Sequence, residues 1–461
     1  MPTNLADITP HVPKLKQPSN RTWAYRGVRA VTAAVQRWCG SHELSLSALE
    51  ASVLRQFGSE AFEDTSFREP MSILLSGLAE TARLNSVGRY AAYQSLRRIL
   101  FNRLSLERAW REAAPDGGRE AGPAVTRPLY VLGLPRTGTT LLFNLLSCDP
   151  QSRPLLFWES QYPVFAPDCR NGYSVKSRQW QAARRIAMLG RLAPDLSSIH
   201  KIDPFGPEEC LWLMENTLHS QSFLLMWEIP EYGDWLRSRT IEQWEIAYRH
   251  YVDTLRLLQR DTSNNCRFVL KFPLHTPHVS TILKLIPDAC FVQTHREVTE
   301  VAASCCSLGY ETRRIMSDVV DPVAVGREIL DTLSETALKG ATASAEHPGR
   351  VLDIHYEHLV KAPIATVRAI YEYFGLTLTA AAEQQMQRWL DSNPKGRHGQ
   401  HTYSLEQFGL DRTTVEARCD AYRPVEQRLS STLKKPSDCS DSDRMEARPV
   451  QAPVPDRTPI R

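Results

Sequence analysis

The segment from Leu129 to Leu146 constrains the fold of this chain more than any other part of the sequence. Leu129 to Leu134 is a short apolar run after a stretch rich in Gly and Pro, which predicts a buried strand. It runs into the loop Gly133-Leu134-Pro135-Arg136-Thr137-Gly138-Thr139-Thr140, and the apolar helix Leu141 to Leu146 follows at once. A strand, a glycine-containing loop and a helix in this order predict the first unit of an α/β fold whose loop cradles an anion.

The same alternation of strand and helix recurs further along the chain. The pattern predicts three more strands, Phe268 to Phe272, Cys290 to His295 and Val351 to His355. It predicts helices at Val279 to Ile286, Val298 to Leu308 and Ile364 to Phe374, the last closed by Gly375 at a C′ position. We therefore expect the α/β class, with a P-loop-like, mostly parallel sheet flanked by helices.

Composition divides the rest of the chain into regions. Residues 1–22 are expected to be a flexible N-terminus and residues 434–461, rich in Pro, Ser, Asp and Arg, a disordered tail. Apolar residues at three- and four-residue steps predict an N-terminal helical region, a cap, over 23–114. Residues 115–433 then form the α/β domain, with a helical insertion at about 160–265. That insertion carries five tryptophans, which suit either an acceptor pocket or helix packing: Trp180, Trp212, Trp227, Trp235 and Trp244.

Charge and cysteine usage narrow the functional classes. The 461 residues include 55 Lys and Arg against 52 Asp and Glu, and this net charge of +3 gives no case for a nucleic-acid partner. No signal sequence and no apolar run of roughly 20 residues occur, so we expect a soluble, cytoplasmic protein without a membrane span. The ten cysteines lack metal-site spacing, which predicts reduced thiols and no metal. The oligomeric state stays open.

The loop from Gly133 to Thr140 favours a multiply charged anion. Its spacing matches a Walker A loop up to Gly138, but Thr139 stands where the phosphate-binding Lys should follow. That difference counts against hydrolysis of ATP or GTP. The loop cation is instead Arg136, whose planar guanidinium suits oxyanions.

A second group of residues follows the predicted strand Cys290 to His295. Arg296 stands at the strand's carboxyl end, and Ser304 comes about two helical turns later. Ligands of open α/β sheets bind beyond the carboxyl ends of the strands, so this pair suits a second phosphate. On its own the spacing is a weak signal, because it occurs by chance in many proteins.

These residues resemble the superfamily of sulfotransferases that use 3′-phosphoadenosine 5′-phosphosulfate (PAPS), in its bacterial-type and tyrosylprotein-type branch. Four stretches carry the resemblance: Leu129 to Pro150 with its Pro-Arg-Thr-Gly-Thr-Thr core, Phe268 to Ser304, Tyr356 to Leu359, and Lys395 to Leu410. The resemblance implies an enzyme that transfers a sulfuryl group from PAPS to a hydroxyl and releases 3′,5′-adenosine bisphosphate. It implies no divalent metal.

The resemblance also assigns the donor site. Arg136, Thr137, Gly138, Thr139 and Thr140 resemble the site of the 5′-phosphosulfate. Arg296 and Ser304 resemble the pair that grips the 3′-phosphate and so distinguishes PAPS from ordinary adenine nucleotides. The basic turn Lys395, Gly396 and Arg397 lies where a loop often closes over that phosphate, although a solvated turn fits it equally well.

Two residue types compete for the catalytic base. The branch that the chain resembles uses an acid shortly after the loop helix, and Glu159 looks like its counterpart, with Phe157 and Trp158 beside it to desolvate the carboxylate. A salt-bridged structural Glu is the alternative. The cytosolic aryl and steroid branch uses a His, which makes His275 the rival, ahead of His278 and His200.

Further positions and functions stay open at this stage. Lys271, just before His275, is either a site cation or part of a buried ion pair, and Phe272 stands where relatives often have a small polar residue. The acceptor is expected to be a small-molecule alcohol: a lipid, a polyketide or a carbohydrate. Trp and Leu in the insertion favour an apolar one. The alternatives are a P-loop kinase or another nucleotide-binding protein on a decayed sulfotransferase fold.

Overall fold

The computed structural model describes residues 43–58, 61–113, 122–164, 175–192, 202–260, 266–393 and 404–433. The expected flexible N-terminus at 1–22 and the expected tail at 434–461 lie outside these residues. So do His200 and the basic turn Lys395 to Arg397. The division of the chain into domains therefore stays a prediction at its ends.

A five-stranded sheet, parallel at every described strand pair, forms the centre of the molecule. Its strands lie in the order β2-β3-β1-β4-β5. Their bounds are β1 Leu129–Gly133, β2 Ser152–Pro154, β3 Arg267–Lys271, β4 Cys290–His295 and β5 Val351–His355. The four predicted strands are confirmed; the sequence missed β2, which has three residues and no apolar run.

Buried side chains alternate between the two faces of the sheet, as strand geometry requires. Leu129 and Val131 of β1 lie in one apolar cluster, with α5, α17 and α18. Tyr130 and Leu132 lie in another, with α12 and α13. The sheet is thus covered by helices on both faces, which confirms the predicted α/β architecture.

The order of the strands brings the ends of β1 and β4 together. The chain passes from β1 to β2 and β3 on one side of β1 and then crosses to β4 on the other side, so the direction of winding reverses at β1. Gly133, the last residue of β1, pairs in register with Thr294 of β4. A side chain at Gly133 would place its Cβ 2.3 Å from the Thr294 carbonyl oxygen, and its φ is +116°. Only glycine fits this close approach.

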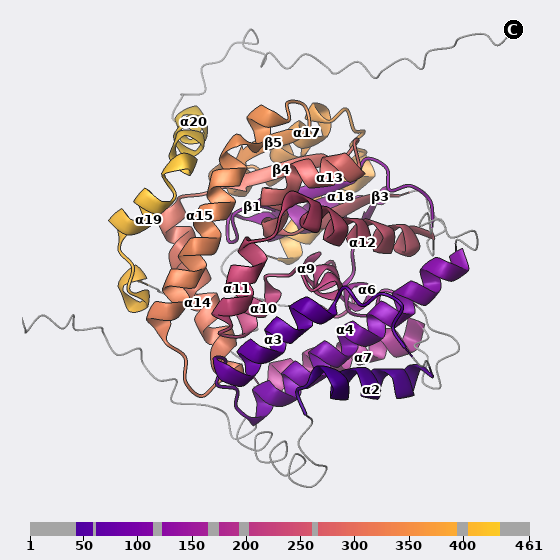
Figure 1. Cartoon of the computed structure of the whole chain (residues 1–461). Coiled ribbons are helices and arrows are strands. Elements are labelled where there is room, and N and C mark those ends of the chain that lie inside the picture. Colours follow the sequence, from indigo (N-terminus) through magenta and orange to yellow (C-terminus); the bar gives the residue numbers. More distant parts are fainter. Residues whose placement is uncertain are drawn as a thin grey trace, which may run out of the picture.

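The helices of the core follow the strands as expected (Figure 1). Gly375 follows α17 with a φ of +60°, as predicted for a helix end. The predicted helix at Val298 to Leu308 extends to Met316. The core helices are α5 Thr139–Ser147, α13 Val279–Leu285, α14 Val298–Met316, α15 Pro322–Glu346, α16 Tyr356–Lys361, α17 Pro363–Tyr373, α18 Ala380–Ser392, α19 Arg412–Arg418 and α20 Arg423–Leu433.

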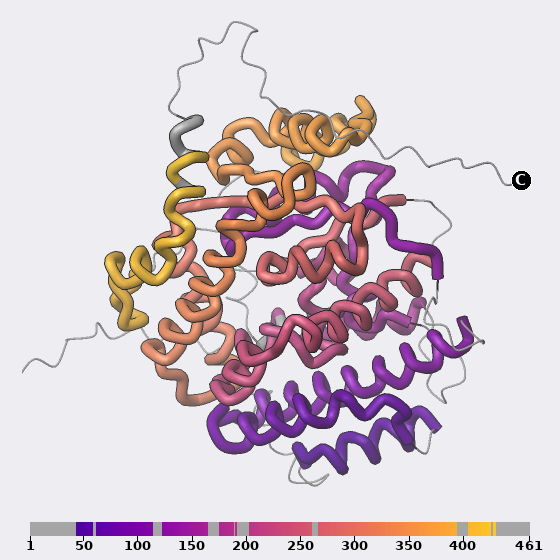
Figure 2. Tube along the Cα trace, turned by 45° about the horizontal axis from the view of Figure 1, so that its top comes forward, coloured from indigo at the N-terminus to yellow at the C-terminus, as the bar shows by residue number. Residues whose placement is uncertain are grey.

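The N-terminal region and the insertion are helical too. The cap contains α2 Leu46–Phe57, α3 Arg68–Glu80 and α4 Ser86–Ala113; the insertion contains α6 Phe157–Gln161, α7 Val175–Leu192, α9 Leu211–Met214, α10 Ser222–Met226, α11 Pro230–Arg237 and α12 Ile241–Arg260. Leu74 and Leu96 of the cap share one apolar core with Phe223, Trp227 and Trp235 of the insertion. Figure 2 shows the cap helices, in indigo and purple, grouped on one side of the sheet.

Candidate active site

The loop after β1 is held in place by a buried threonine. The Thr137 side chain is fully buried, and its Oγ1 donates to the Leu134 carbonyl oxygen at 2.6 Å and lies 2.6 Å from Thr294 Oγ1. Gly138 follows with a φ of +90° and caps α5, and a Cβ there would come within 2.9 Å of Tyr356. The loop is therefore fixed from both sides, and the first N–H groups of α5, which have no partner within the helix, lie at its end.

The structure brings the two predicted phosphate-binding groups together. Arg136 Nε donates to Ser304 Oγ at 3.1 Å, and Arg296 Nη1 donates to the Arg136 carbonyl oxygen at 3.2 Å. Arg296 Nε also donates to Glu300 at 2.9 Å, and its guanidinium lies 4.5 Å from the centre of the Tyr356 ring. Arg136 is exposed and Ser304 half-buried. Two guanidinium groups from different strand ends thus face one open region.

Lys271 adds a cation to this region. It ends β3, is 2% exposed, and donates from Nζ to Thr140 Oγ1 at 3.0 Å. Its Nζ also forms an ion pair with Glu209 Oε1 at 2.7 Å. Lys271 is therefore part of a buried ion pair, and its role as a site cation stays a prediction. No sequence pattern pointed to Glu209, which stands in the insertion and is linked to Thr140 of the loop through Lys271.

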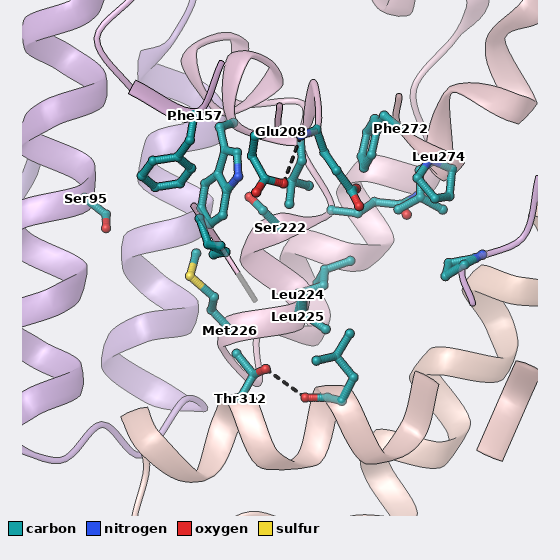
Figure 3. Close-up of a pocket in the computed structure, with 18 of the residues that line it drawn as sticks. Ser95, Phe157, Glu208, Ser222, Leu224, Leu225, Met226, Phe272, Leu274 and Thr312 are labelled. Atoms are coloured by element: carbon teal, nitrogen blue, oxygen red, sulfur yellow. Dashed lines mark hydrogen bonds between the residues drawn. The ribbon is translucent and has the colours of Figure 1, made fainter. Parts of the chain in front are cut away.

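A cavity of about 1010 Å³ opens beside the loop. Arg136, Gly138, Thr139 and Thr140 form part of its wall, and Glu208 and Glu209 line it as well. Most of the remaining wall is apolar, and Figure 3 shows six of these residues around the cavity: Phe157, Leu224, Leu225, Met226, Phe272 and Leu274. A cavity of this size and character suits an apolar organic molecule.

The tryptophans of the insertion divide between the two predicted roles. Trp180, Trp212 and Trp227 line the cavity. Trp235 is buried in the core shared by the cap and the insertion, and Trp244 packs against the same core. The cavity wall therefore uses three of the five.

Glu159 does not line this cavity. It stands in the first turn of α6 and is 8% exposed. One carboxylate oxygen accepts from Arg153 Nη2 at 2.9 Å, and the other accepts from the backbone N–H of Leu156 at 3.1 Å. These contacts are those of the salt-bridged Glu that the sequence left as the alternative, and the position of Glu159 away from the cavity wall argues against a role as base.

His275 is enclosed among aromatic rings and is not itself one of the residues that line the cavity. It is fully buried, its Nδ1 lies 2.7 Å from the Tyr248 hydroxyl, and its ring meets those of Tyr130 and Tyr251. Burial, with a smaller contribution from the charge of His278, holds the pKa of His275 well below its ordinary value. The imidazole is thus neutral but lies behind the cavity wall. Burial likewise lowers the pKa of His278, to about 3.

The described residues also bear on the expectations about metal binding, membrane spans and cysteines. Its residues contain no group of three or more His, Cys, Asp or Glu side chains arranged to hold a metal ion. None of its helices is long and apolar enough to cross a membrane. The cysteines that the structure describes are all free.

Comparison with known proteins gives one consistent result. A family model described as the sulfotransferase family matches residues 128–380. Among curated proteins, the omega-hydroxy-beta-dihydromenaquinone-9 sulfotransferase Stf3 of Mycobacterium bovis is 22% identical over 332 residues, which cover 63% of this chain and 76% of that protein. The Mycobacterium tuberculosis protein of the same name matches equally.

Two solved structures share the architecture. Sulfotransferase STF1 from Mycobacterium tuberculosis is 29% identical, with a TM-score of 0.65, and the match covers 81% of this chain and 98% of that one. Sulfotransferase STF9 from Mycobacterium avium is 22% identical, with a TM-score of 0.72, and the match covers 83% and 97%. Both matches extend well beyond the segment of the family model.

Proposed function

The chain belongs to the sulfotransferase family and is a PAPS-dependent sulfotransferase, and we propose that its acceptor is an apolar small-molecule alcohol held in the cavity of about 1010 Å³. One observation supports this most: the loop from Arg136 to Thr140 opens directly into a cavity whose other walls are mostly apolar. Because the exposed surface of the wall is mostly apolar, a lipid or polyketide alcohol fits it better than a carbohydrate does. Family membership also sets aside the kinase alternative.

For the donor, we propose that its 5′-phosphosulfate lies against the loop. Arg136 and the backbone N–H groups from Thr137 to Thr140 would bind its oxygens, and the glycine at 138 lets the chain curl around them. Arg296 and Ser304 would grip the 3′-phosphate, with Arg296 exchanging its exposed partner Glu300 for the phosphate. The turn at Lys395, Gly396 and Arg397 stays a proposed further contact.

The reaction is an in-line displacement. The acceptor oxygen attacks sulfur, the bond between sulfur and the bridging phosphate oxygen breaks, and 3′,5′-adenosine bisphosphate leaves. Lys271 and Arg136 are placed to balance the charge that develops on the leaving phosphate, since Lys271 Nζ already contacts Thr140 of the loop. Positioning and electrostatic stabilisation then supply most of the rate.

The proton of the acceptor hydroxyl needs a base at the cavity wall. Glu209 lines the cavity and is joined to the loop through Lys271, so we propose Glu209 for this role. Glu159, the prediction from sequence, is tied to Arg153 and Leu156 away from the cavity. His275 is a weaker candidate for the same reason of access.

A direct test of the donor site is calorimetric titration with 3′,5′-adenosine bisphosphate and with ADP, without magnesium. We expect the bisphosphate to bind more tightly than ADP in the wild type and to lose this advantage in Arg296→Ala. Equal binding of the two nucleotides by the wild type would overturn the assignment of the 3′-phosphate grip.

The base is tested by comparing two isosteric variants in sulfation assays with radiolabelled PAPS and a long-chain alcohol. Glu209→Gln should lower kcat per folded molecule by about 10²- to 10⁴-fold, the usual contribution of a general base, and should also lower stability, because it leaves the buried charge of Lys271 uncompensated. Glu159→Gln should lower stability and leave kcat per folded molecule near that of the wild type. The opposite pattern would return the role to Glu159.

We also propose a cytoplasmic location, on the support of the free cysteines, which an oxidising compartment would tend to pair.

A further inference from the structure

A second group of cations lines the same cavity on the side formed by the cap and the insertion. Arg98 comes from α4 and Arg185 from α7, and both belong to the cavity wall. Figure 3 shows Ser95 of α4 across the cavity from Phe272 and Leu274, which follow the loop-contacting Lys271. The cavity therefore has a cationic region at each end, and the wall between them is mostly apolar.

The carboxylate nearest to this second region is fully engaged. Glu215 has no exposed surface, its Oε2 is paired with Arg98 Nη2, and its Oε1 accepts from the Ser222 hydroxyl at 2.9 Å. Arg98 Nη1 donates in addition to the Gln161 carbonyl oxygen at 3.2 Å. Glu215 thus pairs with Arg98 and Ser222, and the described contacts include no hydrogen bond from Arg185 to it.

Arg185 forms no ion pair with a carboxylate in the described part of the chain. In the described part of the chain its polar contact is a single hydrogen bond, from Nη2 to Ser95 Oγ at 3.2 Å. The charged and titratable groups that act on it are Arg98, Glu215 and Tyr162. Burial, and then the charge of Arg98, lower the pKa of Arg185, although a guanidinium stays protonated in proteins. Arg98, Arg185 and Glu215 together thus carry one net positive charge, and Arg97 and Arg184, which also line the cavity, add to the positive charge on this side.

Two further donors in the wall have no acceptor. The indole N–H groups of Trp212 and Trp227 are buried, line the cavity and find no hydrogen-bond partner among the described residues. Trp227 is 2% exposed. Trp212 belongs to the same apolar cluster as Ala182 and Ile186, which lie one turn before Arg185 and directly after it on α7. Buried donors that lack a protein acceptor are uncommon, and a bound ligand would satisfy them.

We propose that this region, formed by Arg185, Ser95 and the two indole groups, binds the carboxylate of an acceptor whose hydroxyl reaches the loop at the other end. The substrate class is then an apolar chain with a hydroxyl at one end and a carboxylate at the other, an ω-hydroxy acid. A guanidinium that forms no ion pair with a described carboxylate suits the carboxylate of a ligand, which it binds through two parallel hydrogen bonds. This inference rests on the proposed function of the cavity.

The test compares ω-hydroxypalmitic acid with its methyl ester in sulfation assays with PAPS. The two differ in charge at the far end and share the same reacting hydroxyl. For the wild type we expect the acid to have a KM at least about tenfold lower than the ester, the effect of one charged hydrogen-bonding pair. Arg185→Gln should abolish that preference by raising the KM for the acid to about that for the ester, and Arg185→Lys should restore part of it.

A matched control is Lys176→Gln, which removes the same charge from the exposed first turn of α7 and should preserve the preference. Sulfation of acid and ester with equal KM by the wild type, or an unchanged preference in Arg185→Gln, would overturn the inference and leave the proposed function intact. If neither compound is sulfated while 3′,5′-adenosine bisphosphate still binds, the apolar acceptor fails, and this inference fails with it. Absence of bisphosphate binding would instead point to the donor site.

Discussion

Replacing Thr137 by valine should loosen the anion-binding loop without emptying space in the core. Valine has nearly the shape of threonine but cannot donate to the Leu134 carbonyl oxygen or contact Thr294 Oγ1, each 2.6 Å away. Thr137 is fully buried, so water cannot replace these contacts. Leaving one buried polar group unsatisfied costs about 1–3 kcal/mol, and we expect a loss of about 2 kcal/mol in the free energy of unfolding.

The same change should weaken donor binding, because the ligand must then order the loop. If about half of the 2 kcal/mol falls on the loop, the Kd for 3′,5′-adenosine bisphosphate rises by about fivefold. Urea unfolding measures the first effect and calorimetry the second. Thr137→Ser, which keeps the hydroxyl, is the control and should retain most of the affinity. A valine variant that binds the bisphosphate as the wild type does, with unchanged stability, would refute the claim that this hydroxyl fixes the loop.

Three further changes test other parts of the structure. Arg98→Met breaks a buried ion pair and leaves the Glu215 charge uncompensated, so urea unfolding should show a loss of about 3–5 kcal/mol; a loss below about 1 kcal/mol would mean that water reaches Glu215. Burial raises the pKa of Glu107 to about 7. Between about pH 4.5 and 7 the folded state therefore keeps a proton on Glu107 that the unfolded state has lost, and the free energy of unfolding falls as the pH rises through this range. Glu107→Gln should therefore raise the free energy of unfolding by about 1 kcal/mol at pH 8 and by little at pH 5, as measured by urea unfolding at the two pH values. An equal effect at both pH values would contradict the raised pKa. Gly138→Ala places a side chain on a residue with a φ of +90° and against Tyr356, so calorimetry should find that binding of the bisphosphate is lost. Binding at wild-type affinity would show that the loop can rearrange to accept the side chain.

The local parts of this site could be read from the sequence. A strand, a glycine loop and a helix follow one another within Leu129 to Leu146, and each is specified by its own residues, so the loop and its Arg136 were predictable. The approach of Arg296 and Ser304 to Arg136 also followed, because parallel strands place their carboxyl ends along one edge of the sheet.

The base could not be read in the same way, because its surroundings depend on distant contacts. Glu159 was a reasonable prediction from its neighbours, but its partner Arg153 lies on β2, a strand too short to leave a sequence pattern. Glu209 reaches the loop through Lys271, which lies on another strand. Neither pairing has a local signature, and both follow from how the insertion packs on the sheet.

The pairing of Gly133 with Thr294 also fixes how far apart the ends of β1 and β4 lie. Each proposed phosphate grip begins a few residues beyond one member of this pair, so the hydrogen-bonded register of β1 and β4 sets the spacing between the backbone positions from which the two grips extend. A donor analogue with the same charges but a longer or shorter span between its phosphates would fit one grip and miss the other. The proposed grips would then select PAPS by the distance between its phosphates as well as by their charge, and the backbone of two adjacent strands would set that distance.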